Sequence, residues 1–149
     1  MTKSVRRFFV PVLVVFLVAS VSTFLFARSE SASKLSYNGT VIAELETVSS
    51  EVALARGLSG REELPKGEGM LFELGEDQQQ TCFWMKDMKF SIDIMWLNAS
   101  KQVVKTMERV SPDTYPESFC SETPVPYVIE LPAGGLSESG IKPGARLDW

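Results

Sequence analysis

One uncharged run constrains this chain more than any other feature. The 20 residues from Phe8 to Ala27 carry no charge and are mostly valine, leucine and phenylalanine. As a helix they would rise about 30 Å, the thickness of the hydrocarbon core of a bilayer. Lys3, Arg6 and Arg7 precede the run, and such a basic flank stays in the cytoplasm. We therefore expect one membrane segment, with everything after it outside the cytoplasm.

The same run could be a membrane anchor or a cleaved export signal. Leu25-Phe26-Ala27 is a poor cleavage site because Leu25 is too large for the −3 position. Ser31-Ala32-Ser33 is a better site, but it lies far from the charged start. This favours a single-pass membrane protein, with secretion after cleavage as the alternative. The expected organisation is an anchor or signal over 1–28, a polar, serine-rich tether over 29–38 and an extracytoplasmic domain over 39–149.

Charge and composition exclude several classes of function. All 19 acidic residues and 11 of the 15 basic residues follow position 28, so that part of the chain has a net charge of −8. Phosphate backbones repel such a surface, and we expect no nucleic-acid partner. The sequence has no histidine, which removes Ser-His-Asp triads, Cys-His dyads and most zinc or copper sites. We expect no metal and no cofactor.

Short apolar segments separated by turn signals fill residues 39–149. Ser49 or Ser50 caps a two-turn helix that Gly57 ends. Residues 98–101 form a hairpin loop, and residues 111–126, with four of the eight prolines, form an irregular loop. The pattern predicts a mainly β fold, a small barrel or sandwich of six to seven strands with one or two short helices. The expected strands are 39–48, 70–72, 82–86, 91–97, 103–110, 127–131 and 145–149.

Two carboxyl groups lie in apolar strands. Asp93 belongs to a segment that is apolar on both faces, which predicts a central strand. Glu130 likewise lies among apolar residues, in the expected strand that starts at Tyr127. An unpaired buried charge is costly, so each carboxyl group requires a partner. Lys86, Arg56 and backbone N–H groups are the candidates. The structural interpretation expects the strands 82–86 and 91–97 to pair, so that Lys86 reaches Asp93 diagonally.

A functional interpretation places the same polar residues around one cleft. Trp84 and Tyr127 would stack on a sugar or another flat ligand, and two carboxylates at a suitable separation could catalyse acid–base hydrolysis. The sequence does not give that separation, so no catalytic residue is assigned. The candidate binding residues are Arg56, Trp84, Lys86, Asp93, Tyr127 and Glu130.

Cys82 and Cys120 are the two cysteines of the chain. An even number of cysteines in an exported domain favours a disulfide, and Cys120 lies in a polar segment where a free thiol would be oxidised. The alternative is two buried free thiols. A disulfide would attach the proline-rich loop to the strand that begins at Cys82.

Several short motifs occur in one order: Arg56-Gly57-Leu58, Gly69-Met70-Leu71-Phe72, Phe83-Trp84-Met85-Lys86, Ile92-Asp93-Ile94, the segment from Pro124 to Gly134, and Gly140-Ile141 before Gly144. Over residues 40–148 they resemble the uncharacterised family named domain of unknown function 192. The resemblance implies a compact, mainly β domain, often exported, with no established activity.

Taken together, the sequence favours a binding or accessory module of the cell envelope over an enzyme. Its expected partners are the membrane, through residues 8–27, and an envelope component or a protein. The alternatives are an envelope polysaccharide hydrolase that uses Asp93 and Glu130, and a purely structural accessory domain.

Overall fold

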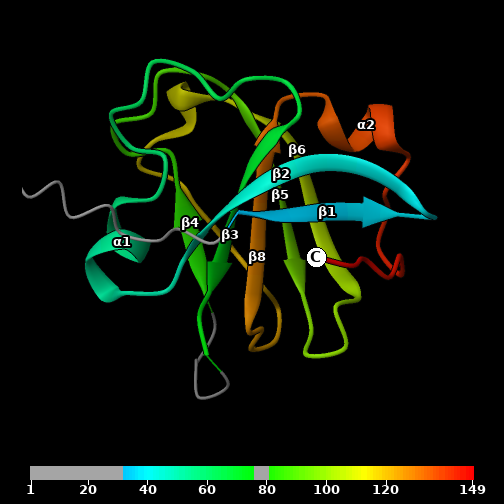
Figure 1. Cartoon of the computed structure of the whole chain (residues 1–149). Coiled ribbons are helices and arrows are strands. Elements are labelled where there is room, and N and C mark those ends of the chain that lie inside the picture. The colour runs from blue at the N-terminus through cyan, green and yellow to red at the C-terminus, as the bar shows by residue number, and fades with distance from the viewer. Residues whose placement is uncertain (1–31, 76–80) are drawn as a thin grey trace, which may run out of the picture.

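A computed structural model describes residues 32–75 and 81–149 of the chain (Figure 1). The predicted anchor over 8–27 and the polar segment 76–80 lie outside these ranges. Neither helix within the described ranges is long and apolar enough to cross a bilayer.

The described residues form a mainly β fold, as the sequence predicted, with eight strands where six or seven were expected. Two short α-helices and one 3-10 turn complete it. In chain order the elements are β1 (Ser33–Tyr37), β2 (Thr40–Val48), α1 (Glu51–Arg56), β3 (Glu68–Glu73), β4 (Cys82–Trp84), β5 (Ile92–Leu97), β6 (Val103–Val110), the 3-10 turn (Pro112–Thr114), β7 (Ser118–Cys120), β8 (Tyr127–Pro132) and α2 (Gly135–Ser139).

Six strands form one sheet in the order β1-β2-β3-β8-β5-β6, and β4 and β7 form a second sheet of two strands. In the larger sheet only β2 and β3 run parallel. The connection between these two strands contains α1, which a parallel pair requires because a tight hairpin cannot join them. All six residues of β5 are buried. The prediction that this apolar segment is an interior strand is confirmed.

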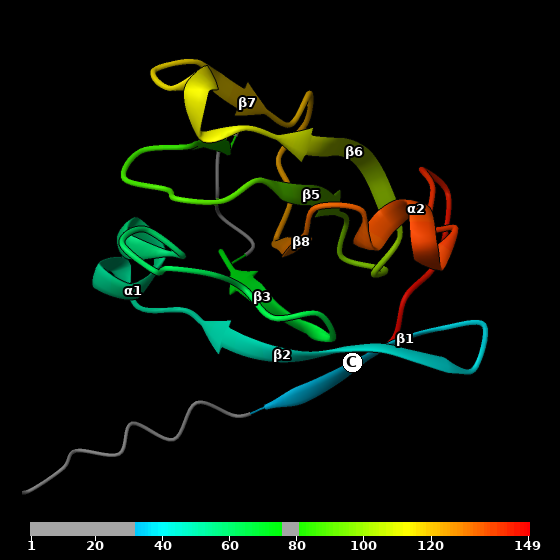
Figure 2. The same cartoon turned by 90° about the horizontal axis from the view of Figure 1, so that it is seen from above.

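The larger sheet has an apolar core on each face, which explains why β5 is apolar on both sides. The first core, which we call the inner core, lies on the concave face of the sheet. It includes Leu35, Leu45, Leu71, Met95, Ile129 and Leu131. The outer core, on the opposite face, includes Leu58, Met70, Phe72, Ile94, Trp96 and Val128. The helix α1 and the β4–β7 sheet pack against the outer core, while α2 lies at the other end of the molecule (Figure 2).

The short helix α1 follows the capping signals of its sequence. The Ser50 side chain accepts a hydrogen bond from the Ala53 backbone N–H, and Glu51 lies in the first turn, where its charge is favourable. Gly57 ends the helix with a φ of 49°, and a Cβ atom there would lie 3.1 Å from the Phe72 ring. Glycine is therefore required both by the backbone and by the close packing of α1 on β3.

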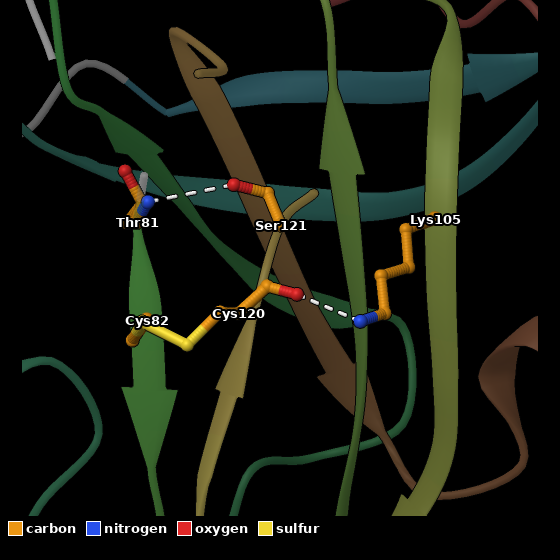
Figure 3. Close-up of a disulfide and its surroundings, with 5 residues drawn as sticks. All are labelled: Thr81, Cys82, Lys105, Cys120 and Ser121. Carbon is orange, nitrogen blue, oxygen red and sulfur yellow. Dashed lines mark hydrogen bonds between the residues drawn. A yellow bond between two sulfur atoms is a disulfide. The ribbon is translucent and has the colours of Figure 1, made fainter. Parts of the chain in front are cut away.

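The β4–β7 sheet contains the disulfide between Cys82 and Cys120, which confirms the predicted bridge. The two cysteines are partners in the strand register. Figure 3 shows further hydrogen bonds beside the bridge: the Ser121 hydroxyl accepts from the Thr81 backbone N–H, and the Lys105 ammonium group donates to the Cys120 carbonyl at 2.7 Å. Residues 111–126 are thus not irregular throughout, because β7 lies within them and pairs with β4.

Both sheets are open, so the strands do not close a barrel. The expected last strand over 145–149 is absent, and this segment instead makes one isolated bridge with each edge of the larger sheet. Asp148 pairs with Ser36 on β1, and Arg146 pairs with Gln102 just before β6. In Figure 2 the red C-terminal segment runs from α2 toward β1. Pro143 and Gly144 form a turn next to it, which the hydrogen bond from the Ala145 N–H to the Lys142 carbonyl closes.

The domain begins earlier than the sequence indicated. Ser33–Tyr37, assigned to the polar tether, form β1 and pair antiparallel with β2. The composition was misleading because Leu35 alone supplies the buried side chain of this strand, while its other side chains are polar or half-exposed. An edge strand with one buried residue has no alternating apolar pattern that could distinguish it from a linker.

Candidate functional site

A cavity of about 360 Å³ lies between α1 and β4, above the outer core. We call it the α1–β4 cavity. The helix and the residues after it form one wall, and β4 forms the other. It is lined by Leu54, Ala55, Arg56, Gly57, Leu58, Ser59, Phe72, Leu74, Thr81, Cys82, Phe83, Trp84, Met88 and Glu130.

Most of the lining is apolar and aromatic. Phe72 from β3 and Phe83 from β4 meet edge to face, with ring centroids 4.9 Å apart. Phe83 also contacts the buried ring of Trp96 edge to face, at 6.3 Å. Edge-to-face pairs of this kind hold aromatic side chains in fixed orientations. The strand β4 is therefore positioned over the sheet by its inward-facing phenylalanine as well as by the disulfide.

Glu130 is the polar group that distinguishes this cavity. Its partners in the strand register are Met70 on β3 and Ile94 on β5, both buried in the outer core. Only 5% of its surface is exposed. Among the described residues, no hydrogen bond or ion pair is made to its carboxyl group. A buried carboxyl group that lines a cavity and lacks a direct partner is rare in a folded protein.

The surroundings of Glu130 decide its protonation state. Burial raises the pKa of its carboxyl group from 4.5 to about 8, because the charged form is poorly solvated among apolar side chains. The Arg61 guanidinium group acts in the opposite direction but is the weaker influence. Arg61 also donates two hydrogen bonds to the carboxylate of Glu46 on β2, at 2.6 and 2.7 Å. Glu130 is therefore predominantly uncharged at neutral pH.

The rim of the cavity carries exposed aromatic and basic side chains. Trp84 is 54% exposed, and its ring lies 6.0 Å from that of Tyr115, which is also exposed. The Lys86 ammonium group lies 5.9 Å from the centre of the Trp84 ring, and the Ser59 hydroxyl donates to the Lys86 carbonyl at 2.8 Å. Arg56, at the end of α1, lines the same cavity. The rim thus offers flat rings and positive charge.

The structure brings together some of the residues singled out from the sequence. Arg56, Trp84 and Glu130 line one cavity, and Lys86 lies against Trp84 at its edge. Their role in binding stays a prediction. Phe72 and Phe83 also line the cavity, and the charge of Arg61 acts on Glu130, although none of the three was singled out from the sequence. The need of a buried glutamate for a nearby cation, which pointed to Arg56 and Lys86, applies equally to Arg61.

Asp93 lies elsewhere and is fully bonded. One of its carboxylate oxygens accepts from the Arg109 backbone N–H at 2.7 Å, and the other accepts from those of Gly134 and Leu136 at 3.0 and 2.9 Å. The predicted contact with Lys86 is wrong, because β4 pairs with β7 and not with β5. Of the three kinds of partner expected from the sequence, Asp93 therefore bonds to backbone N–H groups and not to Lys86 or Arg56.

Asp93 and Glu130 lie on opposite faces of the sheet. Ile94 is the register partner of Glu130 and Leu131 that of Asp93, and consecutive residues of a strand point to opposite faces. The two carboxyl groups therefore do not share a cleft, as the hydrolase hypothesis requires. Tyr127 is also remote from the cavity, since its ring packs edge to face against that of Trp149 at 5.2 Å.

The described residues contain no group of three or more cysteine, aspartate or glutamate side chains placed to hold a metal ion.

The protonation of Glu130 predicts how stability depends on pH. Since the folded state keeps its proton up to about pH 8 while the unfolded state loses it near 4.5, the folded state binds more protons between these values. The free energy of unfolding should therefore fall as the pH rises through this window, by about 1.4 kcal/mol per unit from this group. Urea unfolding at several pH values measures the slope.

Glu130→Gln is the matched variant for this measurement. It keeps the size of the side chain and cannot ionise, so it should remove this contribution to the slope. An identical pH dependence in both proteins would show that Glu130 is ionised in the folded state.

These observations define a small, mainly β domain with an apolar cavity that has one buried carboxyl group on its lining. A family model, domain of unknown function 192, described as "Uncharacterized ACR", matches residues 33–149. The chain belongs to this family, which confirms the resemblance seen in its motifs. The match begins at β1 and so includes the strand that composition had assigned to a tether.

Two solved structures are similar to this chain. A Sinorhizobium meliloti protein, described as a candidate transcription regulator, is 28% identical, with a TM-score of 0.67 over 71% of this chain and 81% of that one. A Novosphingobium aromaticivorans protein of unknown function is 26% identical, with a TM-score of 0.71 over 79% of this chain and 85% of that one. No curated protein matches the chain.

Proposed function

We propose that this protein is a membrane-anchored, extracytoplasmic binding module that holds a small ligand of the cell envelope in the α1–β4 cavity. The observation that carries the proposal is Glu130, which lines a cavity of about 360 Å³ and has no direct partner among the described residues. Ligand sites are typically apolar cavities with a few polar groups that fix orientation. The α1–β4 cavity likewise has a mostly apolar lining, with Glu130 and Arg56 as its charged or titratable groups.

The rival functions have less support. Hydrolysis by Asp93 and Glu130 would require both on one face of the sheet, and backbone N–H groups occupy both oxygens of Asp93. A purely structural domain would not explain why a glutamate remains among apolar residues beside a cavity. A role in transcription, which the description of the Sinorhizobium meliloti protein names, is disfavoured because the net charge of −8 after position 28 opposes contact with DNA.

Ligand-observed NMR on the full chain in lipid nanodiscs tests the proposal, with a panel of small aromatic fragments as probes and empty nanodiscs as the blank. Ala55 lines the cavity and is exposed on α1, so Ala55→Trp should fill the space without disturbing the core. We expect saturable binding of some fragments to the wild type and at least a tenfold loss of affinity in this variant, since a tryptophan would occupy their site.

Val52→Trp is the control, because Val52 is 78% exposed on the same helix and does not line the cavity. It should bind the fragments as the wild type does. Binding that survives Ala55→Trp, or a wild type that binds nothing in the panel, would contradict the proposal.

The location of the domain is tested separately. The uncharged run over 8–27, with its basic flank on the N-terminal side, predicts that residues after it lie outside the cytoplasm. A reporter that is active only in the cytoplasm should therefore be silent when fused after Trp149, while a periplasmic reporter at the same position should be active. A bright cytoplasmic reporter would reverse the predicted orientation.

A further inference from the structure

Resting on the proposed function, we infer that the α1–β4 cavity selects an uncharged ring compound bearing a carbonyl oxygen, which accepts a hydrogen bond from the Glu130 carboxyl group. Three features of the cavity favour such a ligand: its lining, the position of Glu130 within it and the charges that face it.

The walls favour a flat, apolar body. Leu54 and Ala55 on α1 lie across the cavity from Phe83 and Trp84 on β4, and Phe72 lies between the two walls. Phe72 and Phe83 meet edge to face, and both line the cavity. A planar ring can pack against such aromatic side chains, and its burial there is favourable.

The position of Glu130 requires a polar atom on the ligand. Its neighbours in the sheet, Met70 and Ile94, can neither donate nor accept a strong hydrogen bond. A purely apolar ligand would cover the carboxyl group and leave its O–H without a partner, which costs free energy. A carbonyl oxygen on the ligand would satisfy the O–H.

The charges near the cavity disfavour an ionic ligand. A cation would meet Arg56 on the lining and Arg61 close to Glu130. Arg56 and Lys86 at the rim would attract an anion, but the anion would be desolvated among the apolar side chains inside, and Arg61 is already engaged by the Glu46 carboxylate. The other elements that line the cavity, β3 and β4, contribute no titrating side chain to it, since Cys82 is in the disulfide. The neutral form of Glu130 is thus the one that a ligand meets near neutral pH.

Four probes of one ring size separate the possibilities: acetophenone, toluene, benzoate and benzylamine. Acetophenone has a carbonyl acceptor and no donor, so it cannot donate to an ionised Glu130. The affinities of the four probes for the full chain in nanodiscs are measured from the NMR signals of the Trp84 indole and the Met88 methyl group, both on the cavity lining. We expect acetophenone to bind at least about tenfold more tightly than toluene near pH 6. Its affinity should fall about tenfold by about pH 9, where Glu130 has lost its proton. The affinity for toluene should fall less, because toluene has no hydrogen bond to Glu130 to lose.

Two variants of Glu130 sharpen the test. Glu130→Leu suits the apolar surroundings and should fold, and it should lose the preference for acetophenone over toluene. Glu130→Gln can still donate to a carbonyl and should retain that preference without the pH dependence. Equal affinity of the wild type for toluene and acetophenone would overturn the inference and leave the proposed function intact, as would tightest binding of benzoate or benzylamine. If none of the four probes binds, the proposed function fails as well.

Discussion

Replacing Asp93 with asparagine is expected to lower the free energy of unfolding by about 3–5 kcal/mol, because a buried carboxylate that accepts three backbone hydrogen bonds would lose at least one of them. Asparagine has one acceptor oxygen, and its amide group would point at an N–H donor. The melting temperature should fall by about 10–20 °C. Thermal and urea unfolding of the two proteins measure the difference.

The position of Asp93 explains why the loss should be large. Its carboxylate joins β6, where the register with β5 shifts, to the chain segment that begins α2. Arg109 has a positive φ of 53° at this irregularity, so its N–H depends on a side chain and not on a regular ladder. Without the carboxylate, the backbone N–H groups of Arg109, Gly134 and Leu136 lose the acceptor group that they share.

Lys86→Met is the control for Asp93→Asn. The Lys86 side chain is exposed and does not contact Asp93, so its loss should change the free energy of unfolding by less than about 0.5 kcal/mol. The double variant should be as unstable as Asp93→Asn alone. A recovery of stability in the double variant would instead indicate an ion pair between Lys86 and Asp93, which the structure excludes.

Removing the disulfide is expected to have the second large effect. In the chain-entropy model, opening a cross-link between residues 38 positions apart costs about 3–4 kcal/mol. The double variant Cys82→Ala and Cys120→Ala should therefore melt well below the wild type. Because the β4–β7 sheet has only three register pairs, we expect the loss of order to concentrate there.

Two measurements check the role of the disulfide. Peptide mapping without reductant should yield one cross-linked peptide that contains both cysteines, and two alkylatable thiols in the purified protein would refute the bridge. Amide exchange should then show β4 and β7 losing more protection in the alanine variant than β5 and β8 do. Uniform loss over all strands would show that the disulfide stabilises the whole domain equally.

The sequence predicted those parts of the fold that depend on neighbouring residues. The capping serine and the terminal glycine define α1, and alternation or continuous apolar runs define β3, β5, β6 and β8. Pairing was harder to predict because it depends on distant residues. The segment 82–86 and the next strand, β5, are adjacent in sequence, yet β4 pairs with β7 across the disulfide.

The candidate site was predictable in part for the same reason. A carboxylate in an apolar strand is visible in the sequence, and so is the need for a partner, which singled out both Asp93 and Glu130. The sequence did not show that Asp93 accepts backbone hydrogen bonds, whereas Glu130 keeps its proton beside a cavity. Which face each side chain occupies follows from the register, and the N–H groups of Gly134 and Leu136 have no signal in residue type.

The bridges made by residues 146 and 148 have a consequence for self-association. Both free edges of the six-stranded sheet face this one segment, which covers part of each edge. An uncovered edge strand can pair with a strand of another chain, so the partial cover that this segment provides reduces aggregation. The bridge between Ser36 and Asp148 joins residues 112 positions apart, and such distant contacts form slowly. During folding the β1 edge therefore stays open until the segment that contains Asp148 has docked, and the chain is most exposed to self-association in that interval.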